Sequence, residues 1–204
     1  MEVVASGIWS SIERIRQASP VIHNITNYVV MNSTANALLA LGASPVMAHA
    51  EEEVEDMVNI ASALVINIGT LSEKWIKSMF KAASQARKRN IPIVLDPVGA
   101  GATDYRTRTA RQLIEQVPPT IIRGNASEIM ALQDREARTK GVDSMATSDR
   151  ALAAARQLNQ RYGSVICVSG ETDYIVAEQD MTLIRNGHTM MPRVTGLGCT
   201  ASAL

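Results

Sequence analysis

Aromatic residues are scarce in this sequence: they make up 3% of 204 residues and include a single phenylalanine. Aliphatic side chains must therefore fill the interior, and an apolar content of 46% is enough for a sizeable core. A chain of this length suits one compact unit. We predict a single domain over residues 1–204.

An excess of charge of either sign is also missing, since Lys plus Arg and Asp plus Glu both number 20. Nucleic acids and anionic membrane surfaces attract proteins with a basic excess, so we expect neither partner. The apolar runs have the length of strands and fall short of the ~20 residues that a membrane-spanning helix needs. Glu2 comes early and Arg14 late, which is the wrong order for a secretory signal.

Cysteine occurs only twice, as Cys167 and Cys199. Two distant cysteines give neither a disulfide framework nor the ligand spacing of a zinc site. The reducing cytoplasm is the expected compartment. His23 and His49 lack the spacing of a helical metal pair, so we expect them to be hydrogen-bonded crevice or surface residues.

The common nucleotide-binding loops are absent as well. No segment reads Gly-x-x-x-x-Gly-Lys-Ser/Thr, the phosphate loop of many nucleotide hydrolases. Gly99-x-Gly101 follows an apolar run, but Asp104 stands where the dinucleotide motif has its third glycine. A nucleotide bound by this chain would be held in another way.

Short apolar runs alternate with amphipathic segments of helix length along the chain. We predict strands over 21–25, 44–47, 63–68, 91–95, 120–123 and 164–169, a hairpin of 174–176 with 181–184, and helices over 8–17, 29–41, 72–90, 104–116, 125–133 and 149–162. The strands are apolar on both sides, which is typical of an α/β fold with a mostly parallel sheet covered by helices on both faces.

Three stretches between these segments carry further expectations. Thr26 and Asn27 are candidates to cap the helix over 29–41. The acidic cluster 51–56 is expected at a helix start, where negative charge is favourable, rather than around a metal, because consecutive carboxylates point in different directions. The polar stretch 134–148 is expected to be a loop, and we assign it no function.

Polar residues follow most of the predicted strands at their carboxyl ends. In parallel sheets, ligands bind in the crevice beyond those ends. The residues concerned are His23, Asn24, His49, Asn67, Asp96, Arg123, Asn125 and Ser169. Their agreement across several strands predicts a binding site at this edge.

Several residues at or near these strand ends allow both a structural and a functional interpretation. A carboxylate at the end of a buried strand, such as Asp96, must be paired, neutralised or bound to a cation. Asn125 and Glu128 have the spacing of a helix capping box, but they also suit Mg²⁺ and its waters on a nucleotide phosphate. Arg123 is then either an ordinary strand-end arginine or the group that neutralises a transferring phosphoryl group.

Residues 195–199 read Thr-Gly-Leu-Gly-Cys, and a helix is expected from Thr200 onward. Gly196 and Gly198 tolerate unusual backbone angles, so this loop can present free amides and the positive end of a helix to an anion. A helix start also lowers a cysteine pKa, which would make Cys199 a partly ionised base. The alternative is a glycine-rich turn with a small buried cysteine.

These segments together resemble the hydroxyethylthiazole kinases of thiamin salvage, members of the ribokinase-like superfamily. The resemblance rests on residues 23–27, 39–47, 95–102, 122–129, 169–174 and 195–199, which occur in the family's order. Most ribokinase-like kinases have aspartate at the position of Cys199, so the cysteine points to this branch.

The resemblance implies a three-layer αβα sandwich and ATP- and Mg²⁺-dependent phosphorylation of the hydroxyl of 4-methyl-5-(2-hydroxyethyl)thiazole. It also implies a homotrimer with active sites at subunit interfaces. The implied roles are Cys199 as base, Gly198 and the other amides of 196–199 as anion hole, Arg123, Asn125 and Ser169 toward ATP, Met47, Gly196 and Asn27 toward the thiazole, and Asp96 and Glu128 as magnesium-side carboxylates.

Family members continue beyond Cys199 with further helices, so the domain is expected to lack its C-terminal helices. Two alternatives follow from this resemblance. One is a kinase of another small alcohol such as a hydroxymethylpyrimidine, against which Cys199 and residues 24–27 argue. The other is a catalytically impaired or assembly-only subunit. A nucleotide-binding redox protein is a more distant possibility.

Overall fold

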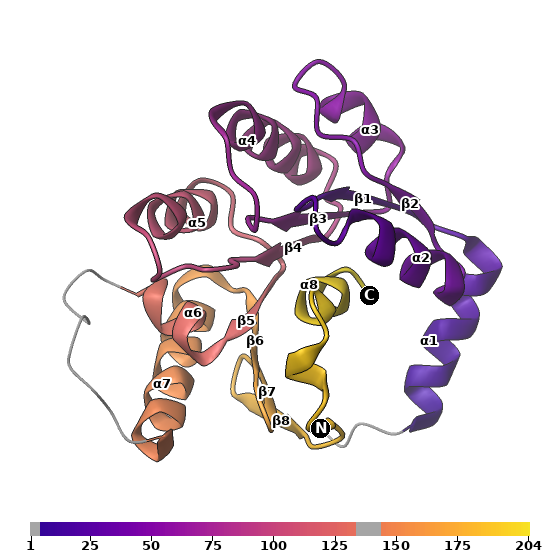
Figure 1. The fold of residues 1–204 in the computed structure, drawn as a ribbon. Helices are drawn as coiled ribbons and strands as arrows, with labels where there is room; N and C mark the ends of the chain where they lie inside the picture. Colours follow the sequence, from indigo (N-terminus) through magenta and orange to yellow (C-terminus); the bar gives the residue numbers. More distant parts are fainter. Residues whose placement is uncertain (1–4, 134–143) are drawn as a thin grey trace.

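The structure is a computed structural model that describes residues 5–133 and 144–204. Within these residues, a single eight-stranded sheet has the order β2-β1-β3-β4-β5-β6-β7-β8 (Figure 1). The strands are β1 (Val21–Ile25), β2 (Ser44–Val46), β3 (Ala63–Asn67), β4 (Ile93–Asp96), β5 (Ile121–Asn125), β6 (Val165–Ser169), β7 (Asp173–Ala177) and β8 (Asp180–Ile184). Strands β1 to β6 pair in parallel and β7 and β8 add antiparallel, which confirms the predicted mostly parallel sheet and the hairpin.

Helices lie on both faces of this sheet, as the α/β prediction required (Figure 1). One face carries α3 (Val54–Ile60), α4 (Glu73–Lys88), α5 (Asp104–Gln116), α6 (Ala126–Ala131) and α7 (Ser144–Tyr162). The other carries α1 (Ala5–Ala18), α2 (Met31–Leu41) and α8 (Leu197–Ala203), and a short 3₁₀ helix, η2 (Met191–Arg193), leads into α8.

Local sequence signals explain several helix starts. The Ser72 hydroxyl accepts a hydrogen bond from the Trp75 amide at the start of α4. Glu55 and Asp56 lie in the first turn of α3, so the acidic cluster decorates a helix start as predicted. Asn125 and Glu128 form a reciprocal capping box at α6.

Two local predictions were wrong. Helix α2 begins at Met31, and its N-cap residue Val30 makes no side-chain capping bond; Thr26 and Asn27 are buried instead. Residues 144–148 belong to α7, although their polar composition suggested a loop, because the helix over 149–162 extends one turn and more toward the N-terminus. The remainder of that stretch, 134–143, lies outside the described residues.

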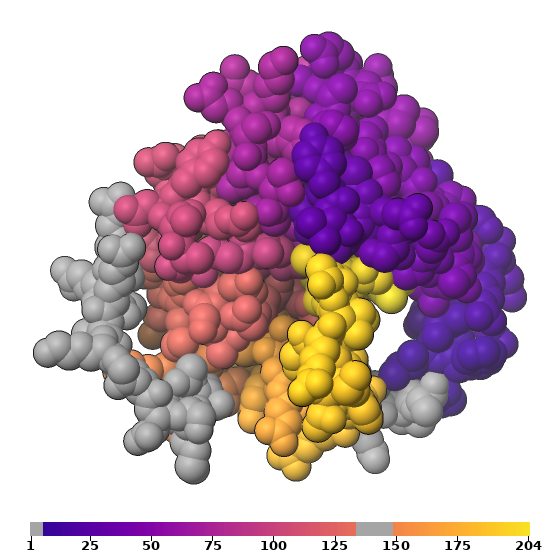
Figure 2. Space-filling view, viewed as in Figure 1, coloured from indigo at the N-terminus to yellow at the C-terminus, as the bar shows by residue number. Residues whose placement is uncertain are grey.

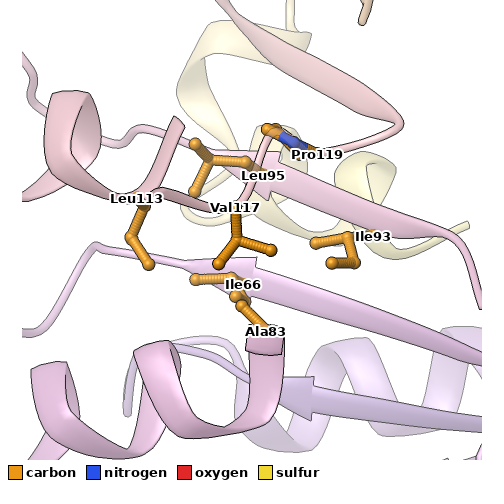
Figure 3. Close-up of a pocket in the computed structure, with 7 residues that line it drawn as sticks. All are labelled: Ile66, Ala83, Ile93, Leu95, Leu113, Val117 and Pro119. Atoms are coloured by element: carbon orange, nitrogen blue, oxygen red, sulfur yellow. The ribbon is translucent and has the colours of Figure 1, made fainter. Parts of the chain in front are cut away.

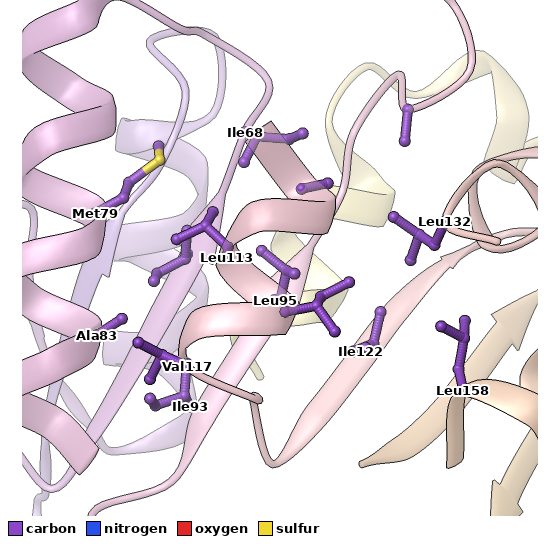
Figure 4. Close-up of a cluster of buried hydrophobic side chains, with 14 of the residues drawn as sticks. Ile68, Met79, Ala83, Ile93, Leu95, Leu113, Val117, Ile122, Leu132 and Leu158 are labelled. Atoms are coloured by element: carbon purple, nitrogen blue, oxygen red, sulfur yellow. The ribbon is translucent and has the colours of Figure 1, made fainter. Parts of the chain in front are cut away.

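Most of the apolar core lies between the sheet and the helices α3 to α7. Figure 4 shows aliphatic side chains of the sheet, such as Leu95 and Ile122, packing against residues of the helices, such as Met79 and Leu113. A smaller cluster of Leu38, Ala43, Val65 and Ala203 lies on the other face, beneath α2 and α8. Among the helices of the described residues, none is long and apolar enough to cross a membrane.

A cavity of about 10 Å³ interrupts the larger core. Figure 3 shows the apolar side chains that line it, from Ile66, Ala83, Ile93, Leu95, Leu113, Val117 and Pro119. A water needs roughly 10–15 Å³ and several polar partners, so this cavity is dry. The functional site must be sought elsewhere.

Candidate active site

Helix α8 brings the C-terminal segment onto the sheet. It contacts β3, β4 and α2, and Figure 2 shows the segment directly beside the N-terminal elements. The Thr34 and Thr200 hydroxyls lie 3.2 Å apart and join α2 to α8. This docking places residues 196–202 at the carboxyl edge of the sheet, where the sequence predicted the ligand crevice.

The helix begins earlier than predicted. Gly196 is its N-cap with a φ of 77°, and α8 starts at Leu197 rather than at Thr200. A Cβ at position 196 would overlap Cγ1 of Val30, so glycine is required by space as well as by backbone angle. Gly198 does not use a positive φ. Gly198 and Cys199 therefore lie in the first helical turn and not in a loop before it.

This first turn leaves backbone donors free. No backbone acceptor among the described residues pairs with the amides of Gly198 and Cys199, whereas the Thr200 amide donates to Gly196 O at 2.9 Å. Free amides at a helix start suit an anion.

A buried network of side chains lies beneath the turn. Asn27 donates to Asn67 Oδ1 at 3.0 Å and to the Cys199 Sγ at 3.5 Å. Asn67 donates in turn to Asp96 Oδ2 at 2.8 Å. The ends of β1, β3 and β4 thus meet α8 through Asn27, Asn67 and Asp96, three residues that are at most 5% exposed.

Asp96 is a buried acid with two donors on one oxygen. Ser202 Oγ, like Asn67 Nδ2, lies 2.8 Å from its Oδ2. Burial, more than any other factor, raises the pKa of Asp96 to about 6; the Ser202 bond lowers it, and the Glu128 charge raises it further. The charge of Arg123 also favours the ionised form.

Arg123 reaches α8 from β5. Its Nη1 donates to Gly198 O at 2.9 Å and lies 3.3 Å from Ser202 Oγ. Among the hydrogen bonds of the described residues, only this nitrogen of the guanidinium is engaged. The other N–H groups keep their capacity to bind an anion.

The thiol of Cys199 differs from the prediction. Burial and the nearby Asp96 charge raise its pKa, although Asn67 and Asn27 partly offset this through hydrogen bonds. The predicted lowering of the pKa by the helix start was wrong, because desolvation and a carboxylate both disfavour the thiolate. The thiol is protonated at neutral pH.

A second group of predicted residues lies at the ends of β5 and β6. Asn125 and Ser169 are direct partners in the sheet register. Glu128 accepts from the Gly99 amide at 2.8 Å and from the Asn125 amide at 2.9 Å. The capping-box interpretation is therefore confirmed, and the same carboxylate also holds the loop after β4.

The predicted residues beyond β1 and β2 lie toward the edge of the sheet. Met47 follows β2, the edge strand, and no hydrogen bond of the described residues joins it to Asn27 or Cys199. Nearby, the rings of His49 and Trp75 are in contact, with centroids 4.6 Å apart and their planes tilted by 45°. His23 is fully buried and its Nε2 bonds to Ala48 O at 2.8 Å, as expected of a hydrogen-bonded crevice residue.

Two residues of the site region were missed from sequence. Ser202 looked like one small helical residue among several, and only folding brings it to Asp96. Arg106 donates to Ile68 O, Val98 O and Gly69 O and so clamps the loops after β3 and β4 together. As one of three arginines in an amphipathic helix, it gave no signal for this.

The fold and the position of the site define the class first. A ribokinase-like superfamily protein from Enterococcus faecalis superposes with a TM-score of 0.59 at 16% identity, covering 90% of this chain and 68% of that one. This likeness shows a ribokinase-like fold, the three-layer sandwich predicted above.

The particular family follows from closer relatives. The model of the hydroxyethylthiazole kinase family matches residues 12–204. A hydroxyethylthiazole kinase from Syntrophus aciditrophicus is 64% identical over 205 residues, covering all of this chain and 76% of the relative. The structure of a hydroxyethylthiazole kinase from Pyrococcus horikoshii superposes with a TM-score of 0.88 at 44% identity, covering 98% of this chain and 74% of that one. The chain belongs to the hydroxyethylthiazole kinase family and is an enzyme of the kinase class.

Proposed function

We propose that this kinase transfers the γ-phosphoryl group of ATP to the hydroxyl of 4-methyl-5-(2-hydroxyethyl)thiazole, a step of thiamin biosynthesis. Family membership supports the substrate, and the relatives do not favour a hydroxymethylpyrimidine. The observation that carries the proposal is that free amides and a cation meet at the first turn of α8, while Ser202 near the end of the same helix bonds to a buried carboxylate.

The amides of residues 196–199, above all those of Gly198 and Cys199, form the anion hole for the γ-phosphoryl group. Phosphoryl transfer needs positioning and charge stabilisation more than covalent chemistry. Arg123 faces this turn, and its unengaged N–H groups add positive charge as the phosphoryl group leaves ATP. Asn125 and Ser169, at neighbouring strand ends, complete the ATP side.

The thiazole lies between Met47, Asn27 and Gly196, with its hydroxyl beside Cys199. The hydroxyl oxygen forms the new bond to the γ-phosphorus, the bond between that phosphorus and the β–γ bridging oxygen breaks, and ADP leaves. The hydroxyl proton passes to water, or to the small fraction of Cys199 that is thiolate. Because the thiol of Cys199 is protonated at neutral pH, its help as a base is modest. A loose transition state tolerates a weak base, since the nucleophile loses its proton late.

The carboxylates of Asp96 and Glu128 suit a Mg²⁺ ion that is also bound to the phosphates of ATP. No cluster of three metal-binding side chains occurs within residues 5–133 and 144–204, so an all-protein cage is absent there. Mg²⁺ keeps most of its waters and needs only one or two carboxylates beside phosphate oxygens. Asp96 would hold it directly and Glu128 through water; bound there, the ion would neutralise phosphate charge.

A homotrimer with sites at subunit interfaces accounts for the surface beside the site. Tyr28 and Val29 are 62% and 71% exposed, although they follow the buried Asn27 directly. Apolar side chains of this size, exposed next to each other, mark contact surfaces. A neighbouring subunit would cover them and close the thiazole side.

Calorimetric titration with hydroxyethylthiazole, followed by an ADP-release assay, tests the proposal. We expect saturable binding and turnover, with hydroxymethylpyrimidine at least about tenfold poorer in kcat/KM because its ring does not match the pocket. Binding without ADP release would support the impaired-subunit alternative. A folded, assembled protein that binds no thiazole would refute the substrate assignment.

A further inference from the structure

Ser202 is buried, and its hydroxyl has three partners. The side chain is 5% exposed, and its Oγ lies 2.8 Å from Asp96 Oδ2, 3.2 Å from Gly198 O and 3.3 Å from Arg123 Nη1. No other serine of the described residues contacts both a carboxylate and a guanidinium.

The direction of these bonds follows from the chemistry of the groups. A hydroxyl has one proton to donate, and Arg123 can only donate, so Ser202 accepts from Arg123. Its own proton goes to Asp96 at the shorter distance, where Asn67 also donates. Ser202 therefore couples the cation to the buried carboxylate, which form no direct ion pair among the described residues.

The same groups hold one particular peptide unit. Arg123 Nη1 donates to Gly198 O at 2.9 Å. Ser202 Oγ lies 3.2 Å from the same oxygen but gives its proton to Asp96, so it acts on this carbonyl through Arg123. The Gly198 carbonyl and the Cys199 amide belong to one planar unit, with the N–H directed opposite to the C=O. Whatever fixes this carbonyl also fixes the direction of the Cys199 N–H.

We infer that Ser202 is a positioning residue for phosphoryl transfer. By accepting from Arg123 and donating to Asp96, it fixes the guanidinium that holds Gly198 O relative to the buried carboxylate, so that the amide of the anion hole and the buried acid act on the same phosphoryl group. This inference rests on the proposed function and adds to it a residue outside the predicted set.

Three variants test the role. Ser202→Ala removes the hydroxyl, Ser202→Thr keeps it, and Ser78→Ala is the matched control. Ser78 is also buried in a helix, but its hydroxyl bonds only to Lys74 O of its own helix. We expect kcat of Ser202→Ala to fall by about 10- to 100-fold, as small misplacements of reacting groups do, with KM for the thiazole little changed. Ser202→Thr should recover most of kcat, and Ser78→Ala should match the wild type.

A second readout does not depend on turnover. Alkylation of Cys199 by iodoacetamide, followed by peptide mass spectrometry, reports how firmly the first turn of α8 is held, with Cys167 as internal reference. We expect severalfold faster alkylation of Cys199 relative to Cys167 in Ser202→Ala only. General loosening of the fold would accelerate both cysteines and would count against a local role.

The outcomes separate the inference from the proposed function. A wild-type protein without thiazole kinase activity would overturn the proposed function, and Cys199 alkylation would then decide on Ser202 alone. An active wild type with equal kcat in Ser202→Ala and Ser78→Ala would overturn the inference. So would a Ser202→Thr protein as impaired as Ser202→Ala, because the hydroxyl would then be irrelevant.

Discussion

Folding disfavours the protonated form of the His23 side chain. It is fully buried, and burial lowers its pKa below 6.5 despite the Ala48 bond and the Glu53 charge. Because a carbonyl only accepts, Nε2 carries the proton in its bond to Ala48 O, and Nδ1 has no partner among the described residues. A proton added to Nδ1 would create a buried, unpaired N–H.

Folding stability should therefore fall in acid partly through His23. The unfolded chain protonates this imidazole below about pH 6.5, whereas the folded chain does so only at lower pH, so the free energy of unfolding drops across this window. His23→Gln keeps a donor for Ala48 O and cannot titrate. Urea unfolding at pH 7.5 and 5.5 should show a smaller loss of stability than in the wild type.

The exposed His188 supplies the control for this measurement. His188→Gln should leave the acid loss as large as in the wild type. If His23→Gln loses as much stability as the wild type between the two pH values, burial of His23 is not a source of the acid sensitivity.

Cys199 leads to a pH prediction on activity. Burial raises the pKa of this thiol above its ordinary value, so the thiolate fraction stays small at neutral pH and increases only in alkaline solution. If the thiolate assists proton removal, kcat should rise with pH in this range, and Cys199→Ser should remove the rise and slow transfer by no more than about 10²-fold. The pH profiles of kcat for both proteins, with circular dichroism to confirm the fold, provide the test. An identical profile would leave the backbone amides as the main catalytic element.

At the scale of elements, the start of α8 depends on one glycine. Gly196→Ala would add the cost of a positive φ, about 1–2 kcal/mol, and of overlap with Val30, about 1–3 kcal/mol. Gly163→Ala is the matched control, since Gly163 has a φ of 71° but open space around its Cβ position. Urea unfolding should show the larger loss for Gly196→Ala, together with weaker thiazole binding. Equal losses would mean that the contact with Val30 does not limit position 196.

These elements also show what sequence patterns capture. Strand positions were predictable because runs such as 63–66 are apolar on both sides. Asn67 and Asp96, the polar residues that end β3 and β4, do meet at one edge. The start of α8 was not, because it is set by contact between Gly196 and Val30, 166 residues apart in the chain. The pKa of Cys199 was missed for the same reason: its burial and the Asp96 charge exist only after folding.

At the scale of the whole molecule, the core and the site are separated. The larger core and its dry cavity lie between the sheet and α3 to α7, whereas the polar network lies under α8 with the smaller cluster. Polar groups such as Asn67 and Asp96 are thus concentrated where the apolar core is thin. Burying an acid reduces folding stability. Because the core and the site are separate, this loss of stability arises on the face of the sheet beneath α8, where the candidate active site lies.

Val29 and Tyr28, in the segment between β1 and α2, are exposed, which leads to a prediction on assembly. Val29→Asp should weaken the proposed trimer, because a charge buried in an apolar contact is costly. Sedimentation velocity should then show smaller species, and calorimetry should show thiazole binding weakened by at least about tenfold, since a site at an interface loses its second wall.

Leu183→Asp is the control. It changes an exposed apolar residue on β8, an edge strand far from β1 in the sheet order, and should alter neither property. A Val29→Asp protein that dissociates but binds thiazole as tightly as the wild type would show that each subunit carries a complete thiazole site.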